Sequence, residues 1–181
     1  VGTVLIAKKV NEIRAMDSRI RQKMRHKGFT AKYTFQNILG DSPALKQCKK
    51  HAELYAASEA PVLIYGATGT GKELFAQAMH NSSPRKLFPF VAINCATLPS
   101  ELMESELFGY VKGAFTGASA QGKQGLVDQA HLGTLFFDEV DSLSTSLQAK
   151  LLRLLQEKEF IRVGGDEVIP VDIRIIAACN K

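Results

Sequence analysis

Apolar residues in this chain occur in two patterns, short continuous runs and helical spacings of three or four. The runs predict buried strands at 61–65, 90–94, 134–138 and 172–178. Helical spacing predicts helices at 44–58, 72–80, 99–107 and 146–158, with one further turn at 126–130. Two short segments, 160–163 and 169–170, flank a Gly-Gly-Asp turn. Strands that alternate with helices indicate an α/β fold, a parallel sheet with helices on both faces.

The first 27 residues follow a different pattern, a narrow apolar stripe on a basic helix. Its members recur at steps of four and three: Ile6, Val10, Ile13, Met16, Ile20 and Met24. A stripe of about three heptads is typical of a coiled-coil seam, so we interpret residues 1–31 as a linker or signalling helix that pairs with a copy of itself. An amphipathic helix packed on its own domain is nearly as well supported, and a membrane-surface helix less so. Because the chain opens on Val1 inside an apolar segment, we expect a domain upstream of it.

Composition narrows the class of protein. The 181 residues are 45% hydrophobic and 23% charged, which suits one main globular domain. No apolar run approaches the roughly 20 residues of a membrane span, so we expect a cytoplasmic protein without membrane contact. The three cysteines are odd in number and widely spaced, as expected of reduced thiols.

The excess of positive over negative charge lies in the first 32 residues. Nine Lys or Arg against two acids give residues 1–32 a net charge of +7. Since the whole chain carries +5, the other residues sum to −2. The basic balance is therefore weak support for nucleic-acid contact by the globular part.

The sequence GATGTGKE, at 66–73, has the spacing of a phosphate-binding loop and lies between a predicted strand and a predicted helix. Its glycines let backbone N–H groups surround an anion, and the helix N-terminus adds about half a positive charge. The lysine is expected to reach the β- and γ-phosphates. The candidate nucleotide-binding residues are Gly66, Ala67, Thr68, Gly69, Thr70, Gly71, Lys72 and Glu73.

One position in this loop departs from the usual pattern. Glu73 stands where most phosphate loops place a Ser or Thr that coordinates Mg²⁺. We expect Thr68, Thr70 or water to fill that coordination position, or the metal to depend more on an acid elsewhere.

The sequence LFFDEV, at 135–140, is an apolar strand that ends in two carboxylates. Asp138 can hold Mg²⁺ directly or through water, and Glu139 can polarise a water for in-line attack on a γ-phosphate. Two adjacent acids at a strand end are, alone, usually only solvated. Together with a phosphate loop they predict a catalytic site that includes Lys72.

A third motif, GAFTGA, lies between the other two. Its glycines permit a tight, mobile turn that presents Phe115 and Thr116 at its tip. Such a phenylalanine has no obvious core to enter, which favours contact with a partner. The alternative is an ordinary surface loop with a half-buried Phe. The candidate contact residues are Gly113, Ala114, Phe115, Thr116, Gly117 and Ala118.

With these three motifs in this order, the chain resembles the AAA+ domain of bacterial enhancer-binding proteins, which activate RNA polymerase carrying sigma-54. The resemblance covers residues 32–181, and GAFTGA is highly specific to the family. Supporting segments are KYTFQNILG, ELFGYVKGAFTGA, GTLFFDEV, LQAKLLRLLQE, RVGG and VDIRIIAACN. The basic helix looks like the linker to a sensory domain in propionate-regulator-like or PAS-containing members.

The resemblance implies a P-loop AAA+ core with strand order 5-1-4-3-2, and an ATPase that uses ATP and Mg²⁺. Family members assemble into hexameric rings with ATP between neighbours. Their GAFTGA loop presents Phe115 and Thr116 to sigma-54, and hydrolysis remodels the closed promoter complex to an open one. DNA is bound by a C-terminal helix-turn-helix.

The resemblance also assigns roles to single residues. Asn94 matches the asparagine that couples nucleotide state to the catalytic glutamate, and Asn180 matches part of a nucleotide sensor. Cys179 replaces the usual Thr of that sensor, and Ala67 replaces the usual Glu of the phosphate loop. The segment near the adenine is matched by Ile38, Leu39 and Gly40.

The chain stops at Lys181, before the family's arginine fingers, second sensor, helical lid and DNA-binding domain. The resemblance therefore implies a domain that is incomplete at its C-terminus, whose strand 61–65 forms an unprotected apolar edge. One alternative function is a nucleotide- and sigma-54-binding fragment without turnover of its own. A less favoured one is an unrelated AAA+ enzyme such as a protease-associated unfoldase, whose pore loop usually carries an aromatic between aliphatic residues.

Overall fold

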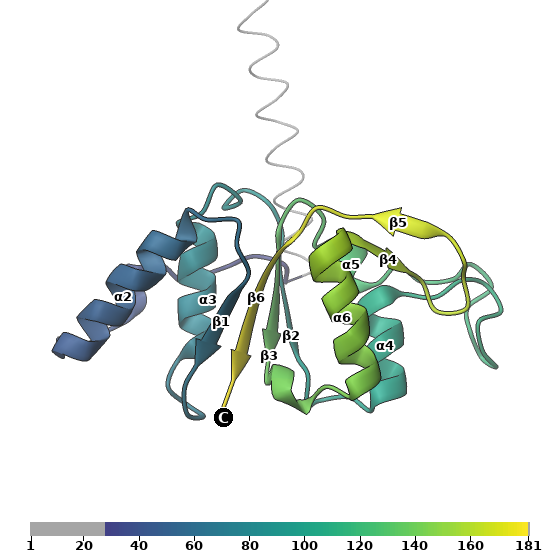
Figure 1. Ribbon diagram of the computed structural model, residues 1–181, viewed down its shortest axis with the longest axis horizontal. Helices are drawn as coiled ribbons and strands as arrows, with labels where there is room; N and C mark the ends of the chain where they lie inside the picture. Colours follow the sequence, from purple (N-terminus) through teal and green to yellow (C-terminus); the bar gives the residue numbers. More distant parts are fainter. Residues whose placement is uncertain (1–27, 181) are drawn as a thin grey trace, which may run out of the picture. The chain divides into compact units, whose positions relative to one another are not determined.

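A four-stranded parallel sheet organises the protein (Figure 1). The structure is a computed structural model that describes residues 28–180. Strands β1 (Val62–Tyr65), β6 (Arg174–Cys179), β3 (Thr134–Asp138) and β2 (Phe90–Asn94) lie in the order β1-β6-β3-β2. All four predicted strands are confirmed, within two residues at each end.

Helices cover both faces of this sheet, as expected for the α/β class (Figure 1). On one face α3 (Lys72–Asn81) packs against β1, β3 and β6, with α2 (Pro43–Ala56) beside it. On the other face lie α4 (Ser100–Phe108) and α6 (Thr145–Glu157). Each helix in residues 28–180 is too short or too polar to cross a bilayer.

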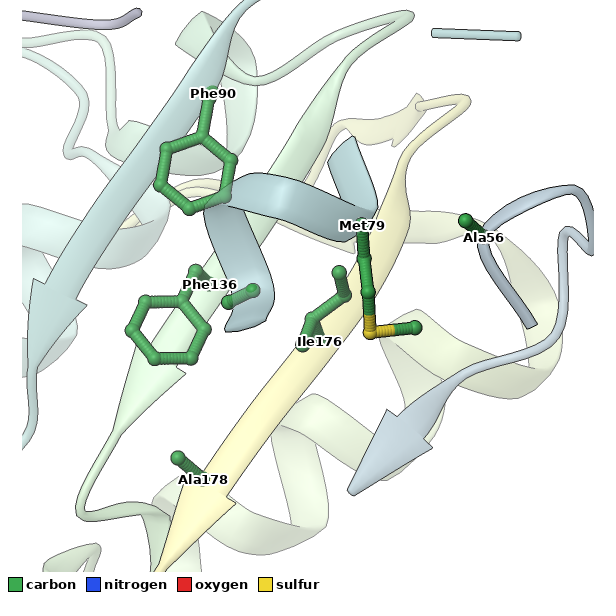
Figure 2. Packing of buried hydrophobic residues seen from close by; sticks show 7 residues of the cluster. Ala56, Met79, Phe90, Phe136, Ile176 and Ala178 are labelled. Carbon is green, nitrogen blue, oxygen red and sulfur yellow. The ribbon is translucent and has the colours of Figure 1, made fainter. Parts of the chain in front are cut away.

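Successive side chains of the central strands point to opposite faces, which builds two apolar layers. On the α3 side, Phe136, Ile176 and Ala178 pack with Met79 in the main core cluster (Figure 2). On the other side, their neighbours Phe137, Ile175 and Ala177 line a groove beneath α6, with Leu151, Leu152 and Leu155. Because both faces of β3 and β6 are covered, their sequences read as continuous apolar runs.

The remaining elements are short. They are η1 (Phe35–Asn37), α5 (Leu126–Gln129), η2 (Val140–Ser142) and an antiparallel hairpin of β4 (Glu159–Ile161) and β5 (Val168–Pro170). The hairpin projects away from the four-stranded sheet (Figure 1). Two longer helices begin at serine caps, since Ser42 Oγ accepts from Leu45 N at 3.2 Å and Ser144 Oγ accepts from Leu147 N at 3.4 Å.

β1 forms an edge of the sheet, as expected. Within the described residues its one strand neighbour is β6, and the side chains of Leu63 and Tyr65 are exposed. The expected linker helix of residues 1–31 lies, apart from its last residues, outside the described part of the chain, and that assignment stays a prediction.

Charged side chains tie loops together at the edge where the strands begin. Arg85 forms ion pairs with Glu59 at 2.7 Å and with Asp172 at 2.6 Å. The fully buried Arg174 donates to the backbone oxygens of Ala56 at 2.8 Å and Tyr55 at 2.6 Å. It therefore satisfies the C-terminal carbonyls of α2 and joins that helix to β6.

His80 is buried beside this network, on the inner side of α3. Its Nδ1 lies 2.9 Å from Thr134 Oγ1. Burial lowers the pKa of His80 to about 4, against a hydrogen bond to the backbone of Phe88 that raises it and the charge of Arg174 that lowers it further. The folded protein therefore holds a neutral imidazole where the unfolded chain, with its ordinary pKa near 6.5, binds a proton more readily.

This difference predicts that the folded state loses stability as pH falls from about 6.5 towards 4, because in that window the unfolded chain takes up a proton that the folded state does not. From pH 7 to pH 5 the contribution of His80 is about 2 kcal/mol. Urea unfolding at the two pH values, in the native protein and in His80→Gln, measures it. We expect the variant to show a smaller pH-dependent loss, and equal losses in both proteins would contradict this assignment.

Candidate functional site

The carboxyl ends of the four parallel strands meet at one edge of the sheet (Figure 1). Tyr65 is in register with Cys179, and Asn94 with Asp138. Gly66 N then donates to Cys179 O at 3.3 Å, which joins the first residue of the phosphate loop to the end of β6. Three predicted groups therefore share one edge: the phosphate loop, the acid pair and the two asparagines.

The phosphate loop ends at Gly71, which caps the N-terminus of α3 with φ 84°. That φ lies in the left-handed region, which favours glycine. No side chain of the cap accepts from the helix, so the first-turn N–H groups of α3 remain available to an anion. The phosphate loop and the N-terminus of α3 together form the anion-binding geometry that the glycine spacing predicts.

Lys72 is the first residue of α3, and only 9% of its surface is exposed. Its Nζ donates to Gly66 O at 2.9 Å, to Ala67 O at 3.1 Å and to Asn180 Oδ1 at 2.6 Å. The ammonium is thus held inside the loop by three oxygens, one of them from the end of β6. The predicted residues Lys72 and Asn180, distant in the chain, are in direct contact.

The other side chains of the loop face solvent or bond within the domain. Ala67, Thr68 and Thr70 are all exposed, and Thr70 Oγ1 donates to Ala67 O at 2.8 Å, which closes the turn. Glu73 Oε1 accepts from Gln77 Nε2 at 3.0 Å, so its carboxylate is engaged one turn further along α3.

The acid pair lies at the end of β3. Asp138 is the last strand residue, and its Oδ1 accepts from Glu139 N at 3.1 Å. Glu139 has φ 54° and ψ 46°, a left-handed conformation that costs a non-glycine residue of order 1–3 kcal/mol. The pKa of the Cys95 thiol is raised to about 12. Burial is the larger cause, and the negative charge of Asp138 is the next.

The donor set at this edge fits a magnesium ion. Mg²⁺ is typically bound by one or two protein carboxylates together with substrate phosphates and water. Asp138 and Glu139 supply carboxylates at the same edge of the sheet as the phosphate loop. Residues 28–180 contain no group of three or more His, Cys, Asp or Glu side chains that could hold a metal ion.

Asn94 ends β2 beside Asp138. Its Oδ1 accepts from Ala96 N at 2.9 Å and so shapes the turn after the strand. The expected link between Asn94 and Glu139 stays a prediction.

The segment expected near the adenine precedes α2. Ile38 is buried, and its carbonyl accepts from Lys49 Nζ. Leu39 is exposed, and Gly40 lies against the side chain of Leu45. Leu45 also lines a cavity beside this segment.

That cavity, of about 430 Å³, lies between α2 and β1 and opens onto the phosphate loop at Gly66, Thr70 and Lys72. Sequence reasoning missed its α2 wall, although the helical spacing of the apolar residues there was a usable signal. The wall residues are Leu45, Cys48, His51, Ala52 and Tyr55. Their mostly apolar character suits a flat ring rather than a phosphate.

The GAFTGA loop, residues 113–118, follows α4 and contains two tight turns. Ala114 N donates to Val111 O at 3.2 Å, and Ala118 N donates to Phe115 O at 3.1 Å. Phe115 is 46% exposed and rests edge-on against Tyr110, with ring centroids 5.0 Å apart. The phenylalanine is therefore half-buried on its own loop, with Thr116 exposed beside it.

The β4–β5 hairpin supports the base of this loop. Val111 N donates to Val163 O at 3.1 Å, and Val163 N donates to Gly109 O at 2.9 Å. Gly164, with φ 73°, is so close that a Cβ there would lie 2.8 Å from Ala114 Cβ. Sequence reasoning missed this contact, although RVGG was one of the matching segments.

The family model described as the sigma-54 interaction domain matches residues 38–181. The transcriptional activator RocR of Bacillus subtilis is 51% identical over 180 residues, which are 99% of this chain and 38% of RocR. The regulatory protein AtoC of Escherichia coli is 48% identical over 98% of this chain and 38% of AtoC. This chain thus spans well under half the length of these relatives.

A solved structure is also similar to this chain. NtrX from Brucella abortus in complex with ATP matches with a TM-score of 0.72 and 32% identity, over 98% of this chain and 36% of that protein. The agreement extends the likeness from sequence to the arrangement of strands and helices.

The contact of Gly164 with the GAFTGA loop predicts different costs for two alanine substitutions. Gly117→Ala introduces a Cβ at φ 90° with nothing within 4 Å, so it should cost only the left-handed strain of about 1 kcal/mol. Gly164→Ala has the same strain and also overlaps Ala114, which adds about 1–3 kcal/mol. Chemical denaturation compares the two, and equal free energies of unfolding would refute the close packing.

Proposed function

The chain belongs to the sigma-54 interaction domain family, and on that basis we propose that it is the ATP-binding and ATP-hydrolysing part of a transcriptional activator that remodels sigma-54 RNA polymerase. One observation carries the nucleotide half of this proposal. Lys72, the amides at the N-terminus of α3 and the acid pair after β3 all lie at one edge of the sheet. The contact of Lys72 with Asn180 supports a sensor role for the end of β6.

Each residue of the site has a part in the proposed reaction. Lys72 and the amides of the loop bind the phosphates, and Asp138 holds Mg²⁺. The ion, when bound, neutralises charge on the phosphate oxygens. Glu139 orients the attacking water and withdraws its proton, and Asn94 adjusts Glu139 to the state of the nucleotide. The base lies in the apolar cavity against α2, beside the segment 38–40.

The GAFTGA loop is the proposed contact with sigma-54. Support comes from the exposure of Thr116 and the half-exposure of Phe115 on a loop that the hairpin holds at its base. In the full-length protein we expect a hexameric ring, DNA binding by a separate C-terminal helix-turn-helix, and a cytoplasmic location beside the polymerase.

Replacement of Lys72 by alanine tests the nucleotide site. Loss of a charged phosphate contact costs about 3 kcal/mol, so we expect roughly a hundredfold weaker binding of a fluorescent ATP analogue. In the full-length protein, hydrolysis should be abolished. Lys86→Ala, an exposed lysine after α3, is the matched control and should bind as the native chain does. Native affinity in Lys72→Ala would reject the site assignment.

Replacement of Thr116 by alanine tests the partner loop in the full-length protein. Since Thr116 lies on the GAFTGA loop, outside the phosphate loop and the acid pair, we expect ATP hydrolysis within about twofold of native. Open-complex formation by sigma-54 polymerase should be lost, and footprinting of promoter DNA measures it. Normal promoter opening would remove the loop from the mechanism.

A second candidate function is binding without turnover. Each of the four arginines in residues 28–180 has its own intramolecular partner: Arg85 with Glu59 and Asp172, Arg153 with Glu159, Arg162 with Asp128, and Arg174 with the end of α2. A charge-neutralising arginine contributes about 10³–10⁵ in rate to related phosphoryl transfers. Phosphate release by the 181-residue chain, compared with the full-length protein, separates the two functions.

A further inference from the structure

A row of polar side chains runs along α3, from the phosphate loop to the far end of the helix. Its members are Glu73, Gln77 and Asn81, spaced four residues apart and therefore on one face of the helix. Gln77 is only 7% exposed, although its side chain is polar. Such a buried amide requires hydrogen-bond partners, and here it has three.

The partners of Gln77 lie on two different parts of the chain. Its Oε1 accepts from the backbone N–H groups of Lys32 at 2.7 Å and Tyr33 at 3.3 Å. Its Nε2 donates to Glu73 Oε1 at 3.0 Å. A single side chain thus joins the segment Ala31–Tyr33 to the first turn of α3.

Asn81 also holds this segment against α3: its Nδ2 donates to Tyr33 O at 2.7 Å and to Ala31 O at 3.4 Å. Just after the segment, Phe35 of η1 packs edge-on against Phe75 of α3, with ring centroids 6.4 Å apart. The segment has neither helical nor strand structure, so side chains of α3 supply these partners of its backbone.

The segment Ala31–Tyr33 lies at the junction between two units of the chain. Ala31 is the first residue of the unit Ala31–Lys181, and it is joined covalently to the preceding unit, Val1–Thr30. At the other end, Glu73 directly follows Lys72, whose Nζ lies inside the phosphate loop. The row therefore connects the start of this unit to the nucleotide site across one turn of helix.

We propose that Gln77 is a positioning residue that makes nucleotide binding and docking of Ala31–Tyr33 on α3 depend on each other. The inference rests on the proposed binding of ATP at the phosphate loop. Phosphates bound to Lys72 and the first-turn amides restrict the first turn of α3, which holds Glu73 in place for Gln77. Gln77 then accepts from Lys32 and Tyr33 with less loss of freedom, and by linkage the docked segment favours the nucleotide equally.

Amide hydrogen exchange of Lys32 and Tyr33 in the full 181-residue chain tests this coupling. Saturation with a non-hydrolysable ATP analogue and Mg²⁺ should slow both amides at least about fivefold. Gln77→Glu keeps an acceptor for these amides but replaces the donor to Glu73 with a like charge. In that variant we expect the nucleotide to change the exchange rates by less than about twofold.

A double variant provides the rescue. In Glu73→Gln/Gln77→Glu, the amide at position 73 donates to the carboxylate at position 77, so the bond is restored with its polarity reversed. The nucleotide effect should return to at least about half its native size. Asn81→Ala is the control: it weakens docking without touching Glu73, so exchange should be faster throughout while the nucleotide-dependent ratio stays native.

Three results would overturn the inference: native amides that do not respond to bound nucleotide, a native response in Gln77→Glu, or no rescue in the double variant. Binding is followed separately with a fluorescent ATP analogue. Absence of binding by the native chain would reject the proposed function together with the coupling, whereas binding without an exchange response rejects the coupling alone.

Discussion

Parallel pairing of β3 with β2 and with β6, and of β6 with β1, aligns the carboxyl ends of all four strands at one edge of the sheet. The registers bring Asn94 beside Asp138 and carry β6 to Asn180, while β6 in turn aligns β1 with the start of the phosphate loop. A shift of one residue between β2 and β3 would exchange Phe136 and Phe137 between the two apolar layers and move Asp138 away from Asn94. The same packing that buries Phe136 and Phe137 therefore aligns the groups of the site.

Two groups at this edge, the backbone of Glu139 and the ammonium of Lys72, are held in states that cost free energy. Glu139 has a left-handed backbone, and the ammonium of Lys72 is nearly buried among three oxygens. The packed sheet and α3, whose core residue Met79 packs against Ile176, hold both groups in these states. Strain at a site on a well-packed scaffold is a common property of reacting centres. Here the acid and the lysine are preorganised by elements that carry no chemistry themselves.

Two further regions extend the influence of this scaffold. The β4–β5 hairpin bonds to Val111 and packs against Ala114, so the GAFTGA loop rises from a supported base. On the opposite side of the sheet, Gln77 and Asn81 bind the backbone that leads in from residues 1–30. The proposed partner loop is therefore supported at its base by the hairpin, and the start of the unit Ala31–Lys181 is hydrogen-bonded to α3, the helix that begins at the phosphate loop.

Local patterns in the sequence by themselves determined the positions of the strands, the helices and the phosphate loop. Apolar runs, helical periodicity and glycine spacing act between near neighbours, so the positions of β1, β6 and Lys72 could be predicted. Contacts between distant residues could not. Asn180 meets Lys72 across 108 positions, Gly164 meets Ala114, and the wall of the cavity comes from α2. The strand order itself followed from the family resemblance, and the observed order β1-β6-β3-β2 agrees with it. These contacts depend in addition on strand register and on how helices and loops pack, and only the tertiary structure decides that.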